Sequence, residues 1–487
     1  GVVEMEVVDI AIIGAGLAGL ALGVALQKMG RRVRVVVFEG RDSVGCESGQ
    51  GMSVIGHSLV LLRELGIDWR TLGSPQYDIS LRSAGNATHV LYQVPLQADK
   101  GLAEEFDNTV QYNVHRGELF MALLDLYQAG GGEVRLAHRL VDITGPEATQ
   151  RQRDGRGEFV TAHFRGEIEP VRCRMLVGAD GVHSVARRFV LQGTAPEKHL
   201  VDSGYSCYRG MLKDTPDLAE PLGGSVMFKT VVSPAGRSFT AGTAPRARRF
   251  WLLDASGDAR PVTDAFKRRD ARRRSEQAAT AGLRRRHGNG KIRDTEEQGN
   301  CDLASEEGCG GSDIVAEIVS CMDGFSEEAK EVVRRTSPAD VIKTDVFDGS
   351  VSAITRYGCG RVVLIGDAAH PVVHHFGQGA CLAFEDAVAL CQCISRYDSD
   401  AFPDHVADIV SEFDSWTHWL RCTAILLMSR TCGLLYMCSW TWLSHPFLRI
   451  CLMWPFCLLF TFAVRILLFV GARDLRTFAI SAFAPKP

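Results

Sequence analysis

The alternation of apolar and polar residues predicts an ordered unit at the start of the chain. Residues Val8–Ile13 form a continuous apolar run, which is typical of a strand buried on both faces. Apolar residues recur at helical spacing over Leu17–Met29, and Gly30 follows as a C-cap. A second strand is expected over Val33–Phe38, just before Glu39. This order of strand, helix and strand predicts a βαβ unit in a parallel sheet.

Further along, the pattern predicts more of this first domain and a second sheet. Helices are expected over residues 56–66 and over Arg116–Ala129, and a helical segment over Phe325–Val346. The region from Tyr205 to Leu253 is mostly strand-like, which indicates an antiparallel sheet. Strands are also expected over three shorter segments, Glu133–Ile143, Phe159–Phe164 and Arg174–Gly178, the last of which returns to the first sheet.

Charge interrupts this regular pattern between Asp264 and Asp323. Residues 267–293 contain eleven basic and two acidic residues, whereas residues 294–323 contain nine acidic and no basic ones. Blocks of like charge with few apolar residues are usually disordered, because they cannot bury enough apolar surface to offset the entropy of folding. We therefore expect a solvated, disordered insertion over about 264–323; a regulatory or partner-binding segment is the alternative.

The C-terminal part is unusually apolar. Residues 431–448 and 450–464 contain no formally charged residue, and an 18-residue stretch is at the lower edge of what spans a bilayer. His445, Pro446, Arg449 and Arg465 interrupt this region, and basic residues at a bilayer centre are costly. Two interpretations stay open: a membrane anchor over about 431–470, or a buried helical segment.

Composition sets wider bounds. The chain has 487 residues, of which 23% are charged, and its net charge of −4 gives no indication of a nucleic-acid partner. None of the fifteen cysteines forms a CxxC pair, so the sequence predicts reduced thiols in an intracellular protein and no zinc or thioredoxin-like site. No secretory signal peptide is visible, and organelle targeting stays open because the chain begins at Gly1.

The turn after the first strand carries the first chemical motif. Gly14-Ala15-Gly16-Leu17-Ala18-Gly19 is GxGxxG, in which the glycines allow a tight turn, a close approach to a pyrophosphate and close helix packing. The amides of the following helix then hold the phosphates. Glu39 lies twenty residues beyond Gly19, where its carboxylate can accept both ribose hydroxyls. The sequence therefore predicts a dinucleotide site.

Four later segments specify the dinucleotide through a family resemblance. Leu176–Arg188 resembles the DG motif of single-component (group A) FAD-dependent monooxygenases, and Val362–Ala387 resembles their GD motif. Val114–Leu119 and Gly45–Ile67 follow the same pattern. The resemblance is to the para-hydroxybenzoate and salicylate hydroxylase type, with zeaxanthin epoxidase a relative, and it covers roughly residues 8–250 and 325–395.

The resemblance implies an α/β fold: a Rossmann-like FAD-binding domain of the GR2 type, an inserted antiparallel β-sheet substrate domain and a helical, apolar C-terminus. The FAD-binding domain is expected over 1–75, 114–200 and 358–400. The substrate domain is expected over 76–113 and 201–357, and the C-terminal region, with the open question of a membrane anchor, over 401–487.

The resemblance also implies which residues hold FAD. Asp367 would accept a hydrogen bond from the ribityl chain, and the helix that begins at Gly377–Gly379 would face the flavin ring. Asp180 and a downstream arginine, Arg187 or alternatively Arg188, are assigned to the nicotinamide cofactor. Asp180 alternatively caps the following turn. The cofactor-binding residues expected in this way are Gly14, Ala15, Gly16, Gly19, Glu39, Arg41, Gly51, Arg116, Asp180, Gly366, Asp367, Gly379 and Ala380.

The adjacent His374 and His375 suggest a metal site at first sight. No third ligand stands near them in the sequence, so we expect no metal and assign them to the wall of the substrate pocket. The implied function is an NAD(P)H-dependent FAD monooxygenase that uses O₂, through a flavin C4a-hydroperoxide, on a small aromatic or alkene-containing organic substrate. No catalytic side chain is assigned. The alternatives are a reductase of isoprenoid or lipid double bonds and a degenerate membrane-associated flavoprotein.

Overall fold

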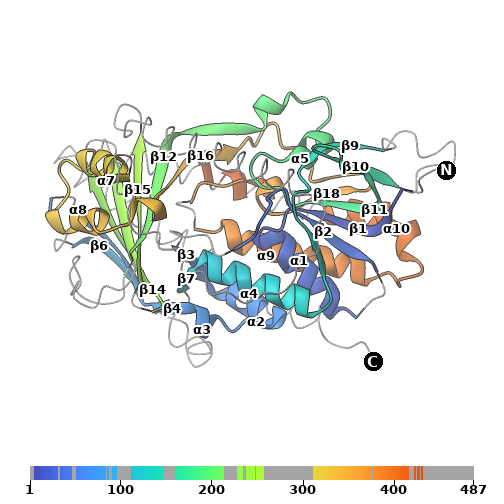
Figure 1. The fold of residues 1–487 in the computed structure, drawn as a ribbon, viewed down its shortest axis with the longest axis horizontal. Helices are drawn as coiled ribbons and strands as arrows, with labels where there is room; N and C mark the ends of the chain where they lie inside the picture. The colour runs from blue at the N-terminus through green and yellow to red at the C-terminus, as the bar shows by residue number, and fades with distance from the viewer. Residues whose placement is uncertain are drawn as a thin grey trace, which may run out of the picture.

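The computed structural model of the protein describes the residues from 5 to 430 with gaps. The described ranges are 5–30, 33–45, 51–83, 85–86, 90–95, 111–145, 159–212, 228–233, 237–246, 248–256, 311–374 and 377–415, with short helical pieces between 422 and 430. Figure 1 shows the described chain as two halves, one built around each of two large sheets.

The first sheet has a parallel centre. Its main strands run in the order β17-β18-β11-β1-β2-β8, and β10 and β9 extend it from β11. All four central strands are parallel to one another. The bounds are β1 Val7–Ile13, β2 Val35–Phe38, β8 Glu133–Arg135, β9 Leu140–Thr144, β10 Val160–Phe164, β11 Val171–Gly178, β17 Gly358–Cys359 and β18 Val362–Leu364.

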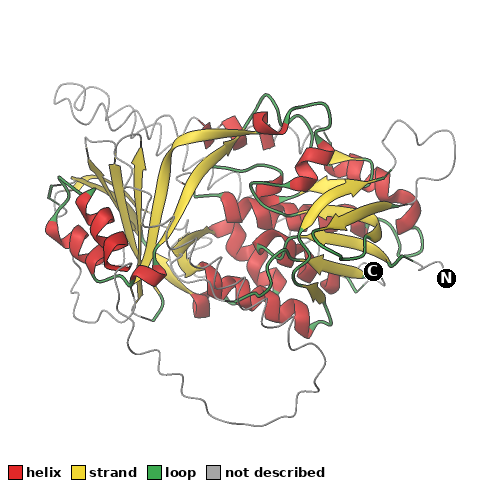
Figure 2. Ribbon diagram, turned by 45° about the horizontal axis from the view of Figure 1, so that its top comes forward, coloured by secondary structure: helices red, strands yellow, loops and turns green. Residues whose placement is uncertain are grey.

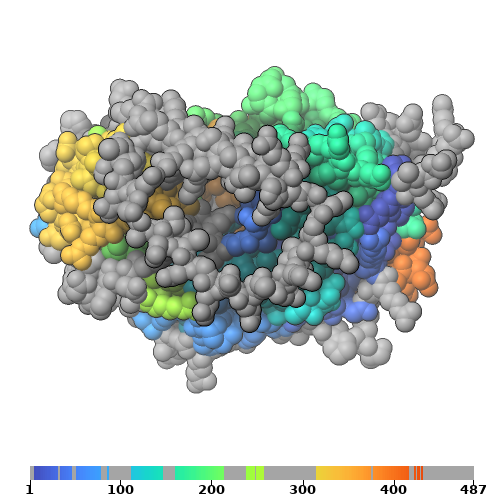
Figure 3. Space-filling view, in the orientation of Figure 1, coloured from blue at the N-terminus to red at the C-terminus, as the bar shows by residue number. Residues whose placement is uncertain are grey.

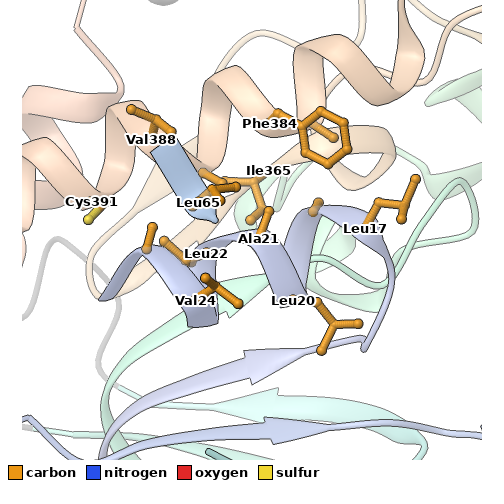
Figure 4. Close-up of a cluster of buried hydrophobic side chains, with 14 of the residues drawn as sticks. Leu17, Leu20, Ala21, Leu22, Val24, Leu65, Ile365, Phe384, Val388 and Cys391 are labelled. Atoms are coloured by element: carbon orange, nitrogen blue, oxygen red, sulfur yellow. The ribbon is translucent and has the colours of Figure 1, made fainter. Parts of the chain in front are cut away.

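Apolar side chains on alternate positions of β1 cover both faces of this sheet. Ile10 and Ile12 belong to one buried cluster with helices α1 and α9, whereas Ala11 and Ile13 belong to a second cluster on the opposite face. Figure 4 shows the first cluster, in which side chains of α1 and α9 interlock around Ile365. The helices of this half are α1 Leu17–Lys28, α2 Gly56–Leu65, α3 Trp69–Leu72, α4 Arg116–Ala129, α5 Val185–Val190, α9 Gly379–Ser395 and α10 Phe402–Phe413.

The second sheet has seven strands in the order β16-β12-β15-β14-β13-β5-β6. It is antiparallel except that β13 and β5 pair in parallel. Figure 2 shows helices on its outer face; these are α7 Gly311–Ser320 and α8 Glu327–Arg334, which cover Tyr208 and Trp251. The strands are β5 Asp78–Ser83, β6 Val90–Pro95, β12 Leu200–Leu212, β13 Phe228–Ser233, β14 Arg237–Ala244, β15 Arg248–Ser256 and β16 Ile342–Gly349.

A small third sheet joins the two halves. It consists of β3 Gly51–Ile55, β7 Gln111–His115 and β4 Gly73–Gln76, in the order β3-β7-β4. Gly51 lies against Phe250 of β15, because a Cβ at this glycine would stand 2.1 Å from the Phe250 Cγ. Gly51 is therefore required for the packing of one half on the other.

Three sequence-based expectations were wrong in detail. Glu133–Ile143 is two strands rather than one, because the chain turns at Ala137, whose φ is +61°. The helical segment expected to reach Val346 ends at Arg334 with α8, and Ile342–Gly349 forms the edge strand β16.

The insertion expected to be disordered to residue 323 contains α7, whose Ile314, Ile318 and the following Met322 are buried against the second sheet. This apolar stripe at helical spacing was obscured by the surrounding acidic residues. Residues 257–310 lie outside the described part of the chain.

The apolar C-terminal region from residue 431 onward also lies outside the described residues, and with it the expected anchor over 431–470. Within the described ranges, no helix is long and apolar enough to span a membrane.

Candidate functional site

Three of the chemical motifs meet at one edge of the first sheet. Ile13 of β1 pairs with Gly178 of β11, and Gly178 pairs with Leu364 of β18. Because these strands are parallel, their carboxyl ends lie side by side, and the loops that follow them start at the same edge. Ligands of open α/β sheets bind outside this edge. The sheet therefore assembles the GxGxxG, DG and GD motifs into one site.

The first turn is closely packed on one side and open on the other. Gly14 has a φ of +108°, and a Cβ there would lie 2.3 Å from the carbonyl oxygen of Ala179. A Cβ at Gly19 would lie 2.1 Å from the carbonyl oxygen of Gly14, so helix α1 packs directly on the turn. Gly16, in contrast, has no atom within 4 Å of its Cβ position. The face of the turn at Gly16 is thus free to receive a phosphate group.

Glu39 holds the same turn from the end of β2. Its Oε2 accepts a hydrogen bond from the Ala15 amide at 2.9 Å. Its Oε1 accepts bonds from the Arg41 amide at 2.9 Å and from Arg41 Nε at 3.2 Å. The carboxylate therefore joins the first βα turn to the loop after β2, which places it at the position expected for ribose binding.

Asp180 and Arg187 have well-defined partners within the protein. Asp180 accepts hydrogen bonds from Ser184 Oγ and from the amides of Val185 and Ala186, so it caps the start of α5. Burial raises the pKa of Asp180, and these bonds oppose the rise.

Arg187 is 2% exposed and donates to the carbonyl oxygens of Asp367, Ala368 and Val182. Burial lowers its pKa to about 10, which leaves it protonated at neutral pH. Arg187 thus binds the DG motif to the GD motif. The nicotinamide role of Asp180 and Arg187 stays a prediction.

Asp367 follows β18 in the short 3₁₀ turn Gly366–Ala368 and faces the start of α9. Its side chain is exposed to solvent, yet the surrounding protein removes enough water to raise its pKa; His370, Arg116 and Arg187 oppose the rise. A Cβ at Gly379 would lie 4.0 Å from Asp367 Oδ1. Figure 3 shows a hollow between the two halves of the molecule.

The remaining predicted residues lie around this edge. Arg116 is the first residue of α4 and interacts electrostatically with Asp367. Gly366 has a φ of +58°, and a Cβ there would stand 3.0 Å from Ala18 Cβ, so the turn lies close to α1. Gly379 and Ala380 open α9, as expected, although the helix runs to Ser395.

Sequence reasoning missed one buried pair that shapes the GD turn. His370 Nε2 and Asp386 Oδ2 are 2.6 Å apart, and the Gly366 amide donates to the same Oδ2 at 2.8 Å. Both side chains are at most 1% exposed. The pair ties the turn to α9. In the sequence, His370 and Asp386 are only a histidine and an acid 16 residues apart, and this spacing alone does not indicate contact.

His374 meets the second sheet. Its Nε2 lies 3.0 Å from Asp254 Oδ1 on β15, and its ring contacts Tyr205 of β12 edge-on. Burial alone would lower the pKa of His374, but Asp254 and Cys207 raise it to about 10. His375 lies outside the described residues. The expectation of no metal rested on the lack of a third ligand, and the structure places Cys207 and Asp254 near His374.

Comparison with known protein families indicates which dinucleotide the chain binds. The family described as FAD binding domain matches residues 7–290 and 325–400, which is more than half of the chain. The chain belongs to the FAD-binding domain family.

Relatives of this FAD-binding protein are monooxygenases and hydroxylases by name. The chain is 28% identical over 410 residues to the 3-amino-4-hydroxybenzoate 2-monooxygenase of Streptomyces cremeus, covering 84% of this chain and 82% of the relative. It is 26% identical over 386 residues to the aurachin C monooxygenase/isomerase of Stigmatella aurantiaca, covering 79% and 80%. Over 436 residues it is 25% identical to a salicylate hydroxylase of Pseudomonas putida, covering 83% and 81%.

Solved structures show the same fold. Klebsiella pneumoniae HpxO complexed with FAD and uric acid has a TM-score of 0.64 at 20% identity, covering 91% of this chain and 92% of HpxO. A salicylate hydroxylase substrate complex has a TM-score of 0.59 at 18% identity and covers 98% of both chains. The resemblance to single-component FAD monooxygenases, the fold class and the enzyme type are thereby confirmed; the relation to zeaxanthin epoxidase stays a prediction.

The residues at the edge of the first sheet fit FAD. Gly16 leaves room for a pyrophosphate beside the first amides of α1, where the helix dipole favours negative charge. Glu39 stands at the end of β2, and Asp367 lies beside Gly379 at the start of α9. The individual contacts of these residues with FAD stay predictions.

Proposed function

We propose that this protein is an NAD(P)H-dependent monooxygenase that transfers one oxygen atom to an electron-rich aromatic or alkene-containing organic substrate. FAD, when bound and reduced by a nicotinamide, supplies the activation of O₂. The part of the protein is to bind and orient the reactants and to exclude bulk water.

The contact between His374 and Asp254 supports the proposal most directly. His374 follows the GD turn that carries Asp367, and Asp254 belongs to the second sheet. One face of this sheet is covered by α7 and α8, through Tyr208 and Trp251 among others. The opposite face, with Tyr205, is therefore the one turned toward the flavin-side loop. A substrate bound between this face of the second sheet and the loop after the GD turn would contact the sheet and the loop.

The charges around this contact suggest how a substrate is oriented. His374 is held protonated by the nearby Asp254 carboxylate, and 22% of its side chain is exposed although its ring nitrogens are buried. Arg209 of β12 lies near the same carboxylate. The positive charges of His374 and Arg209 suit a substrate that carries a phenolate or carboxylate oxygen. The names of the relatives, which include hydroxylases of aromatic acids, agree with such a substrate class.

The proposal is tested on FAD-loaded protein with a panel of aromatic and isoprenoid compounds. We expect NADH or NADPH consumption that speeds up with a true substrate, and one ¹⁸O atom from ¹⁸O₂ in the product. A reduced product without ¹⁸O would instead identify a double-bond reductase. Protein that stays colourless and does not take up added FAD would refute the proposal as a whole.

A further inference from the structure

Three side chains with metal-ligating atoms converge where the second sheet meets the flavin-side loop. They are Cys207 on β12, Asp254 on β15 and His374 after the GD turn. The sulfur, one carboxylate oxygen and one imidazole nitrogen all lie within 4.8 Å of one another. The residues are 47 to 167 positions apart in the chain, so only the fold brings them together.

The positions of these atoms are set by backbone contacts. Cys207 and Asp254 are directly paired on neighbouring antiparallel strands. Directly paired residues have Cβ atoms about 4.5–5.5 Å apart, so both side chains leave the same face of the sheet together. Ser238 Oγ donates to Asp254 Oδ2 at 3.3 Å, which leaves Oδ1 facing His374.

The histidine is held by its loop. The Val373 amide donates to Ser429 Oγ at 3.0 Å, and the Pro371 carbonyl accepts from the Gly349 amide at 2.8 Å. Cys207 and Asp254 are at most 1% exposed. The His374 side chain is 22% exposed, but neither of its ring nitrogens is accessible to solvent. The cluster is thus enclosed by protein, and a metal ion there would have three protein ligands and one position left for a water molecule.

The donor set decides which cation fits. Thiolate, imidazole and carboxylate together are ligands of Zn²⁺, and three protein ligands with an open fourth position are a common tetrahedral arrangement. Mg²⁺ and Ca²⁺ prefer six or more oxygen ligands and are disfavoured by the sulfur. A thiolate and a carboxylate also neutralise the two charges of Zn²⁺.

We propose that Cys207, Asp254 and His374 form a Zn²⁺ site that connects the second sheet to the loop after the GD turn. Bound zinc would replace the proton of His374, so the metal would carry the positive charge that protonated His374 carries without it. It would also fix His374 to the sheet and so restrict movement between the two halves at the substrate side. The site does not depend on the proposed reaction, because zinc uptake is measured without substrate or nicotinamide. Arg209 interacts with both Cys207 and Asp254 and adds a positive charge that opposes the cation.

The experiment is a titration of the FAD-loaded full chain with Zn²⁺ against a chromophoric chelator, at mildly alkaline pH because protons compete for the ligands. The variants are Cys207→Ser, Asp254→Asn and His374→Gln. Cys359→Ser and His405→Gln are matched controls, since Cys359 lies on β17 and His405 on the surface of α10. Far-UV circular dichroism and the flavin spectrum show whether each variant folds.

We expect one high-affinity zinc per wild-type chain and per control chain. Each ligand variant should weaken binding by more than about 100-fold, the upper range for losing an outer-shell partner of a metal site. Co²⁺ in place of zinc should show a thiolate-to-cobalt charge-transfer band that Cys207→Ser abolishes. Arg209→Gln should bind zinc more tightly than wild type, because it removes a nearby positive charge.

Two results would overturn the proposal. One is wild-type protein that takes up no zinc above the level of the three ligand variants. The other is a cobalt complex without a thiolate band. In either case His374 and Asp254 form an ion pair only, and Cys207 is an apolar packing residue beside Val373.

Discussion

Adding one methyl group to either of two glycines in the first turn is expected to have opposite consequences. Gly14→Ala places a Cβ 2.3 Å from the Ala179 carbonyl oxygen, and the native φ of +108° is unfavourable for alanine. Gly16→Ala meets no atom within 4 Å, and its φ of −76° is one that alanine readily adopts. The first change is expected to destabilise the apoprotein, and the second to weaken FAD binding alone.

The magnitude for Gly14→Ala follows from two costs. Left-handed backbone at a residue with a Cβ costs about 1–2 kcal/mol, and overpacking in a close-packed site costs about 1–3 kcal/mol. The clash is with backbone rather than a flexible side chain, next to the Ala179 amide that donates to the Ile13 carbonyl. We therefore expect a loss of about 2–5 kcal/mol in the free energy of unfolding.

For Gly16→Ala the apoprotein should change by less than about 0.5 kcal/mol. The methyl group instead occupies the space expected for the pyrophosphate, so the FAD dissociation constant should rise about 10–100-fold, equivalent to about 1–3 kcal/mol. Chemical denaturation of apoprotein measures the first quantity, and flavin fluorescence titration the second. A Gly16→Ala variant that binds FAD like wild type, or a Gly14→Ala variant of unchanged stability, would refute this description of the turn.

Three further predictions concern other residues of the site and its surroundings. His370→Ala removes the imidazole partner of buried Asp386 and should cost about 3–5 kcal/mol in unfolding free energy. The exposed His405→Ala should cost less than about 0.5 kcal/mol, and equal losses in urea denaturation would contradict this prediction. Glu39→Gln removes the charge expected to bind ribose. It should raise the FAD dissociation constant about 10–100-fold, because a charged hydrogen bond contributes about 1.5–3 kcal/mol. Glu64→Gln on α2 is the control and should leave the FAD dissociation constant unchanged. Burial raises the pKa of Asp348 to about 6, so the folded state binds the carboxyl proton of Asp348 more tightly than the unfolded state does. The stability that this protonation contributes is present below pH 4 and is lost as the pH rises through about 6. Asp348→Asn, which can keep the hydrogen bond from Ser429, should therefore gain stability relative to wild type between pH 4 and pH 8, by up to about 3 kcal/mol; parallel pH profiles of the two proteins would argue against the shift.

The spacing of apolar residues and glycines predicted those helices and strands whose formation depends on residues close to one another in the chain. The helix expected over Arg116–Ala129 has those bounds, and β1 differs from its expected bounds by one residue. Apolar periodicity and turn-forming glycines act over a few residues, so they are readable without the fold. The same pattern failed at Ala137 and at Ile342–Gly349, where pairing with distant strands decides the conformation.

The sequence by itself predicted a dinucleotide site at a GxGxxG turn, and four ordered motifs indicated an FAD monooxygenase, because each motif is a short run whose chemistry is local. Tertiary structure alone decided which of these residues meet. It placed Arg187 between the DG and GD motifs, and it brought Cys207, Asp254 and His374 together. Such contacts depend on strand register and on the direction in which each side chain leaves its strand, and neither is contained in the spacing of residues along the chain.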